Sequence, residues 1–206
     1  QKLAEYGAVI VRLDAFAYAP KAVGKRNFLN EMETWQVLER IKVLADRYDL
    51  TLLPEIHAAY SEKSYETSAK QGYMTYDFFL LGLIVDALEN GDGALLADWA
   101  RELTEKKIRT FSILGCHDCI PMLDLKGIVP DERIDRMIEL IVARSGMIKN
   151  LHGQKNVYYQ VNATYYTPLG KATESCRWRA PYSCSCPASH RCGTWICLLA
   201  RTILKR

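Results

Sequence analysis

Three short segments of the chain end an apolar run with residues that could do chemistry. Arg12 and Asp14 end the first run, Glu55 and His57 end the second, and the third leads into His117-Asp118. Residues two apart along a strand share a face, so each of the first two pairs should point in one direction. In a parallel sheet the carboxyl ends of all strands lie on one side. We therefore expect these ionisable groups to converge there.

Paired carboxylates are suited to breaking a glycosidic bond. One attacks the anomeric carbon, while the other protonates the leaving oxygen and later deprotonates the incoming acceptor. A third carboxylate and nearby His side chains can bind sugar hydroxyls more strongly as the transition state forms. A single Arg-x-Asp at a strand end is more typical of a structural ion pair. With three such segments in succession, two interpretations are equally good: a composite site, or a set of structural ion pairs.

The elements that must position these groups alternate between strand and helix patterns. Short apolar runs predict buried strands, and apolar residues recurring at three- and four-residue steps predict amphipathic helices. This alternation predicts an α/β protein built from βα units, as an open doubly wound sheet or as a closed barrel. The predicted strands are 7–14, 50–57, 73–81 and 108–114, and the predicted helices are 35–48, 62–71 (with Ser61 as cap and Gly72 as stop), 95–103 and 131–142.

Composition and charge exclude several classes of partner. Of the 206 residues 49% are hydrophobic and 25% are charged, and no apolar run approaches the ~18 residues that cross a bilayer, so no membrane partner is expected. Residues 171–206 hold seven Lys/Arg against one acidic residue, whereas residues 1–170 hold twenty basic and twenty-three acidic residues. The body of the chain therefore offers no basic field for nucleic acid. Its two cysteines, Cys116 and Cys119, fit a reducing, cytoplasmic compartment.

The three segments that end in ionisable groups resemble successive signatures of the α-amylase superfamily. Residues 12–18 read Arg-Leu-Asp-Ala-Phe-Ala-Tyr, residues 53–57 read Leu-Pro-Glu-Ile-His, and residues 114–118 read Leu-Gly-Cys-His-Asp, in the right order and at suitable intervals. The resemblance implies a TIM (β/α)8 barrel in which these motifs end strands four, five and seven. Residues 1–170 are then expected to form an incomplete barrel that covers roughly strands four to seven.

The resemblance also implies roles for the residues at the strand ends. Asp14 would be the nucleophile, Glu55 the acid/base, and Asp118 the stabiliser of the transition state. Arg12 would support the nucleophile, and His117 would bind hydroxyls of the transferred glucose. No metal and no organic cofactor is implied.

Details after the nucleophile resemble the sucrose phosphorylase branch of the superfamily. Amylases usually carry Lys-His three and four residues after the nucleophile, whereas this chain has Ala17 and Tyr18, as that branch does. Residues 19–21, 72–79 and 159–166 also look like that branch.

The branch implies a retaining glucosyl transfer with two small-molecule partners. An α-glucosyl unit would pass from sucrose or a related glucoside, such as sucrose 6′-phosphate or glucosylglycerate, to phosphate by double displacement. Gln160 would reach the glucose, and Tyr18 and His57 would help to line the pocket. A hydrolase or transglycosylase on the same site is the nearest enzymatic alternative. The sequence predicts no oligomeric state.

The chain departs from the branch at one position in its third motif. Cys119 stands where the branch usually has Gly, a residue that permits backbone angles that side chains forbid. A metal-ligand set drawn from this motif (Cys116, His117, Asp118 and Cys119) is a weaker interpretation.

Two departures from the family pattern suggest that the chain is a fragment. The first three barrel strands, with their glucose-binding Asp and His, are not in the sequence, and residues 171–206 replace the eighth strand with a Cys-, Ser- and Arg-rich segment. We favour an out-of-frame or disordered tail, because its cysteines lack regular Cys-x-x-Cys spacing. A zinc-binding module in the tail is the alternative. Since a barrel must close to satisfy its edge strands, we expect the 206-residue chain alone to be inactive and prone to association.

Overall fold

The computed structural model describes residues 1–21, 23–25, 28–29, 31–113, 120–144, 146–150, 158–163 and 168. The chain divides into two compact units, each assembled from several separate segments. Unit 1 comprises Gln1–His57, Ser64–Tyr76 and Lys107–Thr110. Unit 2 comprises Ala58–Lys63, Asp77–Lys106 and, within the described part of the chain, the residues from Phe111 onward.

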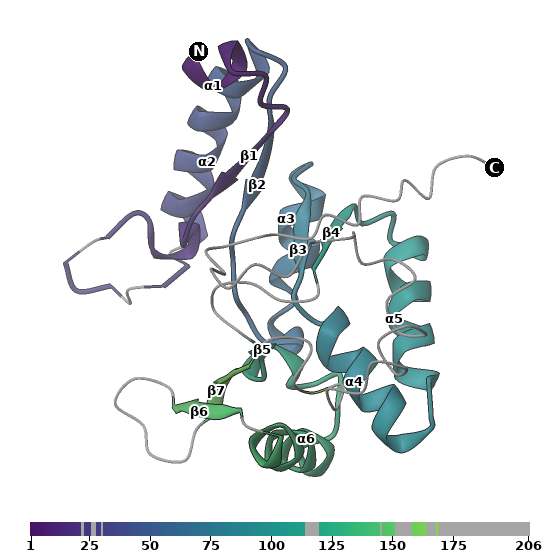
Figure 1. The fold of residues 1–206 in the computed structure, drawn as a ribbon. Coiled ribbons are helices and arrows are strands. Elements are labelled where there is room, and N and C mark those ends of the chain that lie inside the picture. Colours follow the sequence, from purple (N-terminus) through teal and green to yellow (C-terminus); the bar gives the residue numbers. More distant parts are fainter. Residues whose placement is uncertain are drawn as a thin grey trace. The chain divides into compact units, whose positions relative to one another are not determined.

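Unit 1 is built around a pair of parallel strands covered by a long helix (Figure 1). Strand β1 (Ile10–Leu13) pairs with β2 (Thr51–Pro54), with Ile10 opposite Thr51 and Leu13 opposite Pro54. The connection between them contains helix α2 (Glu31–Asp46), as expected when parallel neighbours need a crossover. The other elements of this unit are α1 (Lys2–Glu5), η1 (Phe16–Tyr18) and α3 (Ser64–Lys70).

The core of unit 1 explains why α2 lies on the strand pair. The buried residues of this core come from η1, α2, β2 with the residue just before it, and the segment that follows α3. Burying each large apolar side chain stabilises by about 1.5–3 kcal/mol. They are Phe16, Leu38, Ala45, Leu50, Leu52 and Tyr73. The seven-residue interval between Leu38 and Ala45 is two helical turns, so both side chains face the same core. The amphipathic helix predicted for 35–48 is confirmed, although it begins earlier and ends at Asp46.

Two short strands belong partly to each unit. Strands β3 (Thr75–Asp77) and β4 (Thr110–Ser112) pair with one another in a two-stranded sheet. The predicted strand 73–81 is too long, because helix α4 (Leu80–Asn90) starts three residues after Asp77. The carboxylate of Asp77 accepts a hydrogen bond of 3.0 Å from the backbone N–H of Leu80, which satisfies one of the unpaired donors at the start of a helix.

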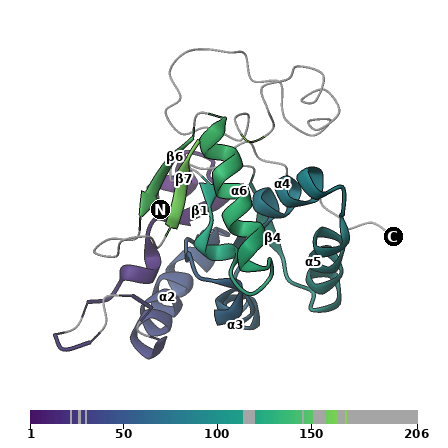
Figure 2. The same cartoon turned by 90° about the horizontal axis from the view of Figure 1, so that it is seen from below.

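Unit 2 combines helices with a small antiparallel sheet. Helix α5 (Ala94–Glu105) and helix α6 (Asp131–Ala143) confirm the predictions for 95–103 and 131–142. Strands β5 (Ile120–Pro121), β6 (Met147–Asn150) and β7 (Tyr158–Asn162) form a three-stranded sheet in the order β5-β7-β6. Helix α6 lies beside β6 and β7 in both views (Figures 1 and 2). The unit also contains two 3-10 helices, η2 (Tyr60–Glu62) and η3 (Leu123–Leu125).

Two expectations about local structure are wrong. Ser61 does not cap a helix, because it lies within η2 and its backbone N–H donates to the carbonyl of Lys126; α3 begins only at Ser64. Gly72, in contrast, follows the end of α3 with a φ of +85°, as predicted.

The second wrong expectation is that the βα alternation extends through unit 2. Strands β5, β6 and β7 pair antiparallel instead. No helix in the described part of the chain is long and apolar enough to cross a membrane.

The buried carboxyl of Asp77 leads to a prediction about pH and stability. Trp99 donates its indole N–H to both carboxyl oxygens at 3.2 Å, and Asp77 is 2% exposed. Burial raises the pKa of Asp77 to about 6, and the hydrogen bonds from Trp99 and the backbone offset only part of that rise. The folded state therefore holds this proton more tightly than the unfolded chain does between about pH 4 and pH 6.

The contribution of Asp77 to stability should accordingly be greatest below about pH 4 and should fall as pH rises through 6. For Asp77 this loss amounts to about 3 kcal/mol on the scale of 1.36 kcal/mol per pKa unit. Asp77→Asn should remove that part of the slope in urea unfolding followed by tryptophan fluorescence at pH 4 to 7. Asp98→Asn, at an exposed position of α5, is the control. An unchanged slope in Asp77→Asn would contradict the assignment.

Candidate active site

The ends of β1 and β2 bring the first two sets of predicted residues together. Asp14 follows the last residue of β1 and Glu55 follows the last residue of β2. The parallel register continues past the strands, since the backbone N–H of Glu55 donates to the carbonyl of Leu13 at 3.0 Å. Two strands that run in parallel and in this register must deliver both acidic residues to the same edge. The predicted convergence of these two strand ends is confirmed.

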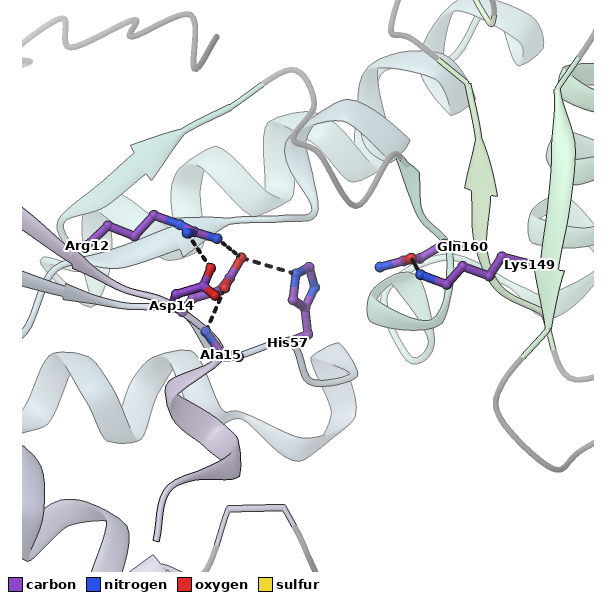
Figure 3. Close-up of polar contacts among 7 residues, drawn as sticks. Arg12, Asp14, Ala15, His57, Lys149 and Gln160 are labelled. Carbon is purple, nitrogen blue, oxygen red and sulfur yellow. Dashed lines mark hydrogen bonds and ion pairs between the residues drawn. The ribbon is translucent and has the colours of Figure 1, made fainter. Parts of the chain in front are cut away.

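Arg12 joins the two carboxylates directly (Figure 3). Its Nη1 donates to Oδ1 of Asp14, and its Nη2 donates to Oε1 of Glu55 at 2.5 Å. A guanidinium carries its donors in a rigid planar fork, so two acceptors bound to different nitrogens are held in a fixed relation. The nucleophile and the acid/base implied by the resemblance thus share one cation.

The two carboxylates differ in their exposure to solvent. The side chain of Asp14 is 68% exposed, whereas that of Glu55 is only 6% exposed. Ionised carboxylates rarely lie buried unless they are paired and hydrogen-bonded. Glu55 meets this requirement through Arg12 and through the backbone N–H of Ala15, which donates to its Oε2 at 2.9 Å. Asp14 is therefore accessible to a ligand, while Glu55 is fixed from two sides.

Ala15 occupies an unusual backbone conformation at this point. Its φ of 45° and ψ of 37° place it in the left-handed region, which residues other than Gly, Asn and Asp rarely adopt. This conformation turns the chain directly after Asp14, and the backbone N–H of Ala15 points at Glu55 (Figure 3). Strained residues of this kind concentrate at functional sites. No residue type in the sequence signals this contact, because it is made by the main chain.

The charge of Arg12 is secured by its two partners. Partial burial lowers the pKa of the guanidinium, but the hydrogen bonds and the negative charge of Glu55, together with the hydrogen bond to Asp14, raise it above its ordinary value. Arg12 therefore stays cationic at any pH at which the protein is folded. A permanent cation bound to both carboxylates orients both of them.

His57 and Tyr18 lie in the same unit as the carboxylates. The Nε2 atom of His57 is 3.9 Å from Oε1 of Glu55, so the expected placement of this pair on one face is confirmed. Tyr18 ends η1, four residues after Asp14, and is about half exposed. Its ring meets that of Phe28 edge-on with the centroids 5.4 Å apart. Phe28 carries no motif signal in the sequence.

The remaining predicted residues belong to unit 2 or fall outside the described part of the chain. Gln160 lies on β7 in unit 2, where it is buried and accepts a hydrogen bond from Lys149. The expectations for His117, Asp118 and the Cys119 position fall on 114–119, outside the described residues, as do those for the tail at 171–206. Among the described residues no group of three His, Cys, Asp or Glu side chains could hold a metal ion.

The arrangement at Arg12 can perform acid–base and nucleophilic chemistry on one bond. An accessible carboxylate beside a buried one, both held by a single cation, supplies the pair that glycosyl transfer with retention requires. In that reaction class the two carboxyl groups lie only ≈ 5–5.5 Å apart. Two carboxyl groups that are hydrogen-bonded to the same guanidinium can lie at such a separation.

Comparisons with known proteins show what the chain is similar to. No protein-family model matches the chain. It is 46% identical over 181 residues to a sucrose 6(F)-phosphate phosphorylase of Ilumatobacter coccineus, a match that covers 84% of the chain and 35% of the relative. It is 31% identical over 172 residues to a glucosylglycerate phosphorylase of Spirochaeta thermophila, covering 81% of the chain and 29% of that relative.

A solved structure shows the same relationship in three dimensions. The crystal structure of sucrose 6F-phosphate phosphorylase from Thermoanaerobacter thermosaccharolyticum superimposes with a TM-score of 0.75 at 29% identity. The superposition covers 84% of the chain and 34% of that structure. The chain thus spans about a third of the length of the proteins that it matches. Over the residues that match, the chain is sucrose phosphorylase-like in both sequence and fold, as its strand-end motifs predict.

Proposed function

We propose that this chain carries the catalytic carboxylates of a phosphorylase that transfers an α-glucosyl unit from a sucrose-type donor to phosphate. The observation that carries the proposal is the double contact of Arg12 with Asp14 and Glu55 at the ends of two parallel strands. Similarity to phosphorylases of sucrose 6F-phosphate and of glucosylglycerate supports a donor of this class. We place the protein in the cytoplasm, where phosphorylated sugars and phosphate are available.

In the proposed first step Asp14 is the nucleophile. One of its carboxylate oxygens attacks the anomeric carbon as the bond from that carbon to the glycosidic oxygen breaks. Glu55, protonated at this stage, donates its proton to the leaving oxygen. The product is a glucosyl ester of Asp14, and the leaving sugar departs as an alcohol. Arg12 keeps both carboxyl groups oriented throughout.

In the proposed second step phosphate takes the place of the leaving group. Glu55, now a carboxylate, accepts the proton of a phosphate hydroxyl as that oxygen attacks the anomeric carbon. The ester bond to Asp14 breaks, and glucose 1-phosphate forms with the original configuration. Asp118 would stabilise the transition state, while His57, His117, Tyr18 and Gln160 would bind the glucosyl group.

We further propose that β1, β2, β3 and β4 are strands four to seven of a (β/α)8 barrel. Their order along the chain, the parallel pairing of β1 with β2 and the match to the phosphorylase structure support this assignment. Residues 1–170 would then carry the barrel segment, and 171–206 would have no part in it. For the 206-residue chain alone we expect no turnover, since a barrel requires closure.

A chimaera tests the proposed function without relying on the chain alone. Residues 5–170 would replace the matching segment of the phosphorylase from Ilumatobacter coccineus. We expect the chimaera to form glucose 1-phosphate from sucrose 6′-phosphate or from a related glucoside, and only when phosphate is present. The unaltered relative and the 206-residue chain serve as positive and negative controls.

Two outcomes would contradict the proposal. A folded chimaera that forms no glucose 1-phosphate from any of the donors would remove the catalytic assignment of this segment. Free glucose that accumulates at the same rate with and without phosphate would show a hydrolase instead.

A further inference from the structure

Gln160 is held at the centre of the three-stranded sheet of unit 2. It lies on β7, the middle strand, with Pro121 of β5 opposite it on one side and Lys149 of β6 on the other. Its residue exposure is 1%, which is rare for an amide side chain without a defined role. The β6–β7 register shifts directly after Lys149, and irregularities of this kind re-aim side chains next to functional sites.

The contact with Lys149 determines which way the Gln160 amide faces. The Nζ atom of Lys149 lies 3.2 Å from Oε1 of Gln160. A lysine ammonium can only donate hydrogen bonds, so the oxygen of the amide must face it. The amide nitrogen then faces away from Lys149, as Figure 3 shows. Among the described residues no other hydrogen bond of the Gln160 side chain is present, so its two N–H groups are not committed to any of them.

We infer that Lys149 is a positioning residue that holds Gln160 as a hydrogen-bond donor toward hydroxyl oxygens of the transferred glucosyl group. An amide can rotate by half a turn and exchange its donor end for its acceptor end at little cost when nothing fixes it. Lys149 removes this ambiguity by stabilising one orientation. The identity of the ligand rests on the proposed function. The orientation of the amide does not depend on that function, because it follows from the contact with Lys149.

The orientation can be measured in the 206-residue chain without any substrate. The side-chain amide signals of Gln160 would be assigned by NMR and compared in the wild type, Lys149→Met and Lys149→Arg. Lys149→Met should shift the Gln160 signals and accelerate their hydrogen exchange, because the hydrogen bond to the oxygen is lost. Lys149→Arg should restore them. Lys70→Met, which removes an exposed lysine of α3, is the control for lost charge.

The consequence for binding is measured in the chimaera with a double-mutant cycle. Lys149→Met should raise KM for the glucosyl donor about tenfold, the scale of one hydrogen bond that involves a charged group, with a smaller effect on kcat. Gln160→Ala should raise KM at least as much. In the Gln160→Ala background, Lys149→Met should have no further effect, because Lys149 acts through the amide.

Each arm can overturn the inference on its own terms. Unchanged Gln160 signals in Lys149→Met would show that Lys149 does not orient the amide. Additive effects of the two substitutions on KM would show that Lys149 acts independently of Gln160. A chimaera without phosphorolysis, combined with the expected NMR shifts, would contradict the proposed function while leaving the orienting role of Lys149 intact.

Discussion

Asp14→Asn in the chimaera is expected to lower the rate of glucose 1-phosphate formation by about 10⁴-fold or more, the scale on which removing an enzyme nucleophile acts. Asn is nearly isosteric with Asp and can still accept the hydrogen bond from Arg12, so the fold should persist. The loss would then be chemical, because an amide oxygen does not form the ester that starts the transfer. Because Asp14 is largely exposed, its replacement should cost little stability.

Glu55→Gln should produce a different pattern in the same assay. With donors whose leaving oxygen needs a proton, loss of the general acid should reduce the rate by about 10²–10⁴-fold. With α-glucosyl fluoride, whose leaving group needs no proton, the first step should remain fast and the glucosyl ester of Asp14 should accumulate. Mass spectrometry of the intact protein after rapid quenching would detect the added glucosyl unit.

The contrast between the two variants separates their roles. Asp14→Asn should not respond to the better leaving group, whereas Glu55→Gln should recover its first step with it. Asp46→Asn, at an exposed position of α2, is a matched control that should leave the kinetics unchanged. Equal rescue of both variants by the fluoride, or no effect of either, would contradict the assignment of nucleophile and acid/base.

Arg12→Met is expected to reduce both stability and activity, because Arg12 is the shared partner of the two carboxylates. Glu55 is almost fully buried, and removing one member of a buried ion pair costs about 3–5 kcal/mol. The partial exposure of Arg12 places the expected loss in unfolding free energy near the lower end of that range. Activity should fall by at least about 100-fold, since both reacting groups lose their fixed orientation.

Arg12→Lys distinguishes charge from geometry. Lysine keeps the positive charge but presents a point charge in place of a planar fork, so it cannot hold both carboxylates in the same relation. We expect it to recover most of the stability in chemical unfolding and little of the activity. Arg40→Met, at an exposed position of α2, is the control for the loss of an arginine. Full activity in Arg12→Lys would show that the orientation set by the guanidinium is not needed.

The strand-end residues of unit 1 were predictable because their signal is local. An apolar run that ends in Arg12-Leu13-Asp14, and another that ends at Glu55, need only be parallel neighbours for the carboxylates to meet. The helix at 131–142 was equally clear, since its apolar residues recur at helical spacing and acidic residues open it.

Other features depend on contacts that sequence periodicity does not encode. The bond from Ala15 to Glu55 is made by a backbone N–H, and it requires a left-handed conformation at an alanine. The predicted strand 73–81 runs into the first two residues of α4, because the start of this helix is an apolar run, and only the bond from Leu80 to Asp77 marks where the strand stops. Lys149 faces Gln160 across paired strands, eleven residues apart in the chain.

The way the two units share the chain bears on how such a gene segment can be recombined. Residues 1–57 of unit 1 fold with 64–76 and 107–110, while 58–63 and 77–106 belong to unit 2. A single genetic crossover anywhere between 57 and 111 would therefore join parts of each unit to unrelated partners. Exchange between relatives should succeed when it transfers this whole stretch together, so homologous swaps with breakpoints inside it should give insoluble or unfolded products more often than swaps outside it.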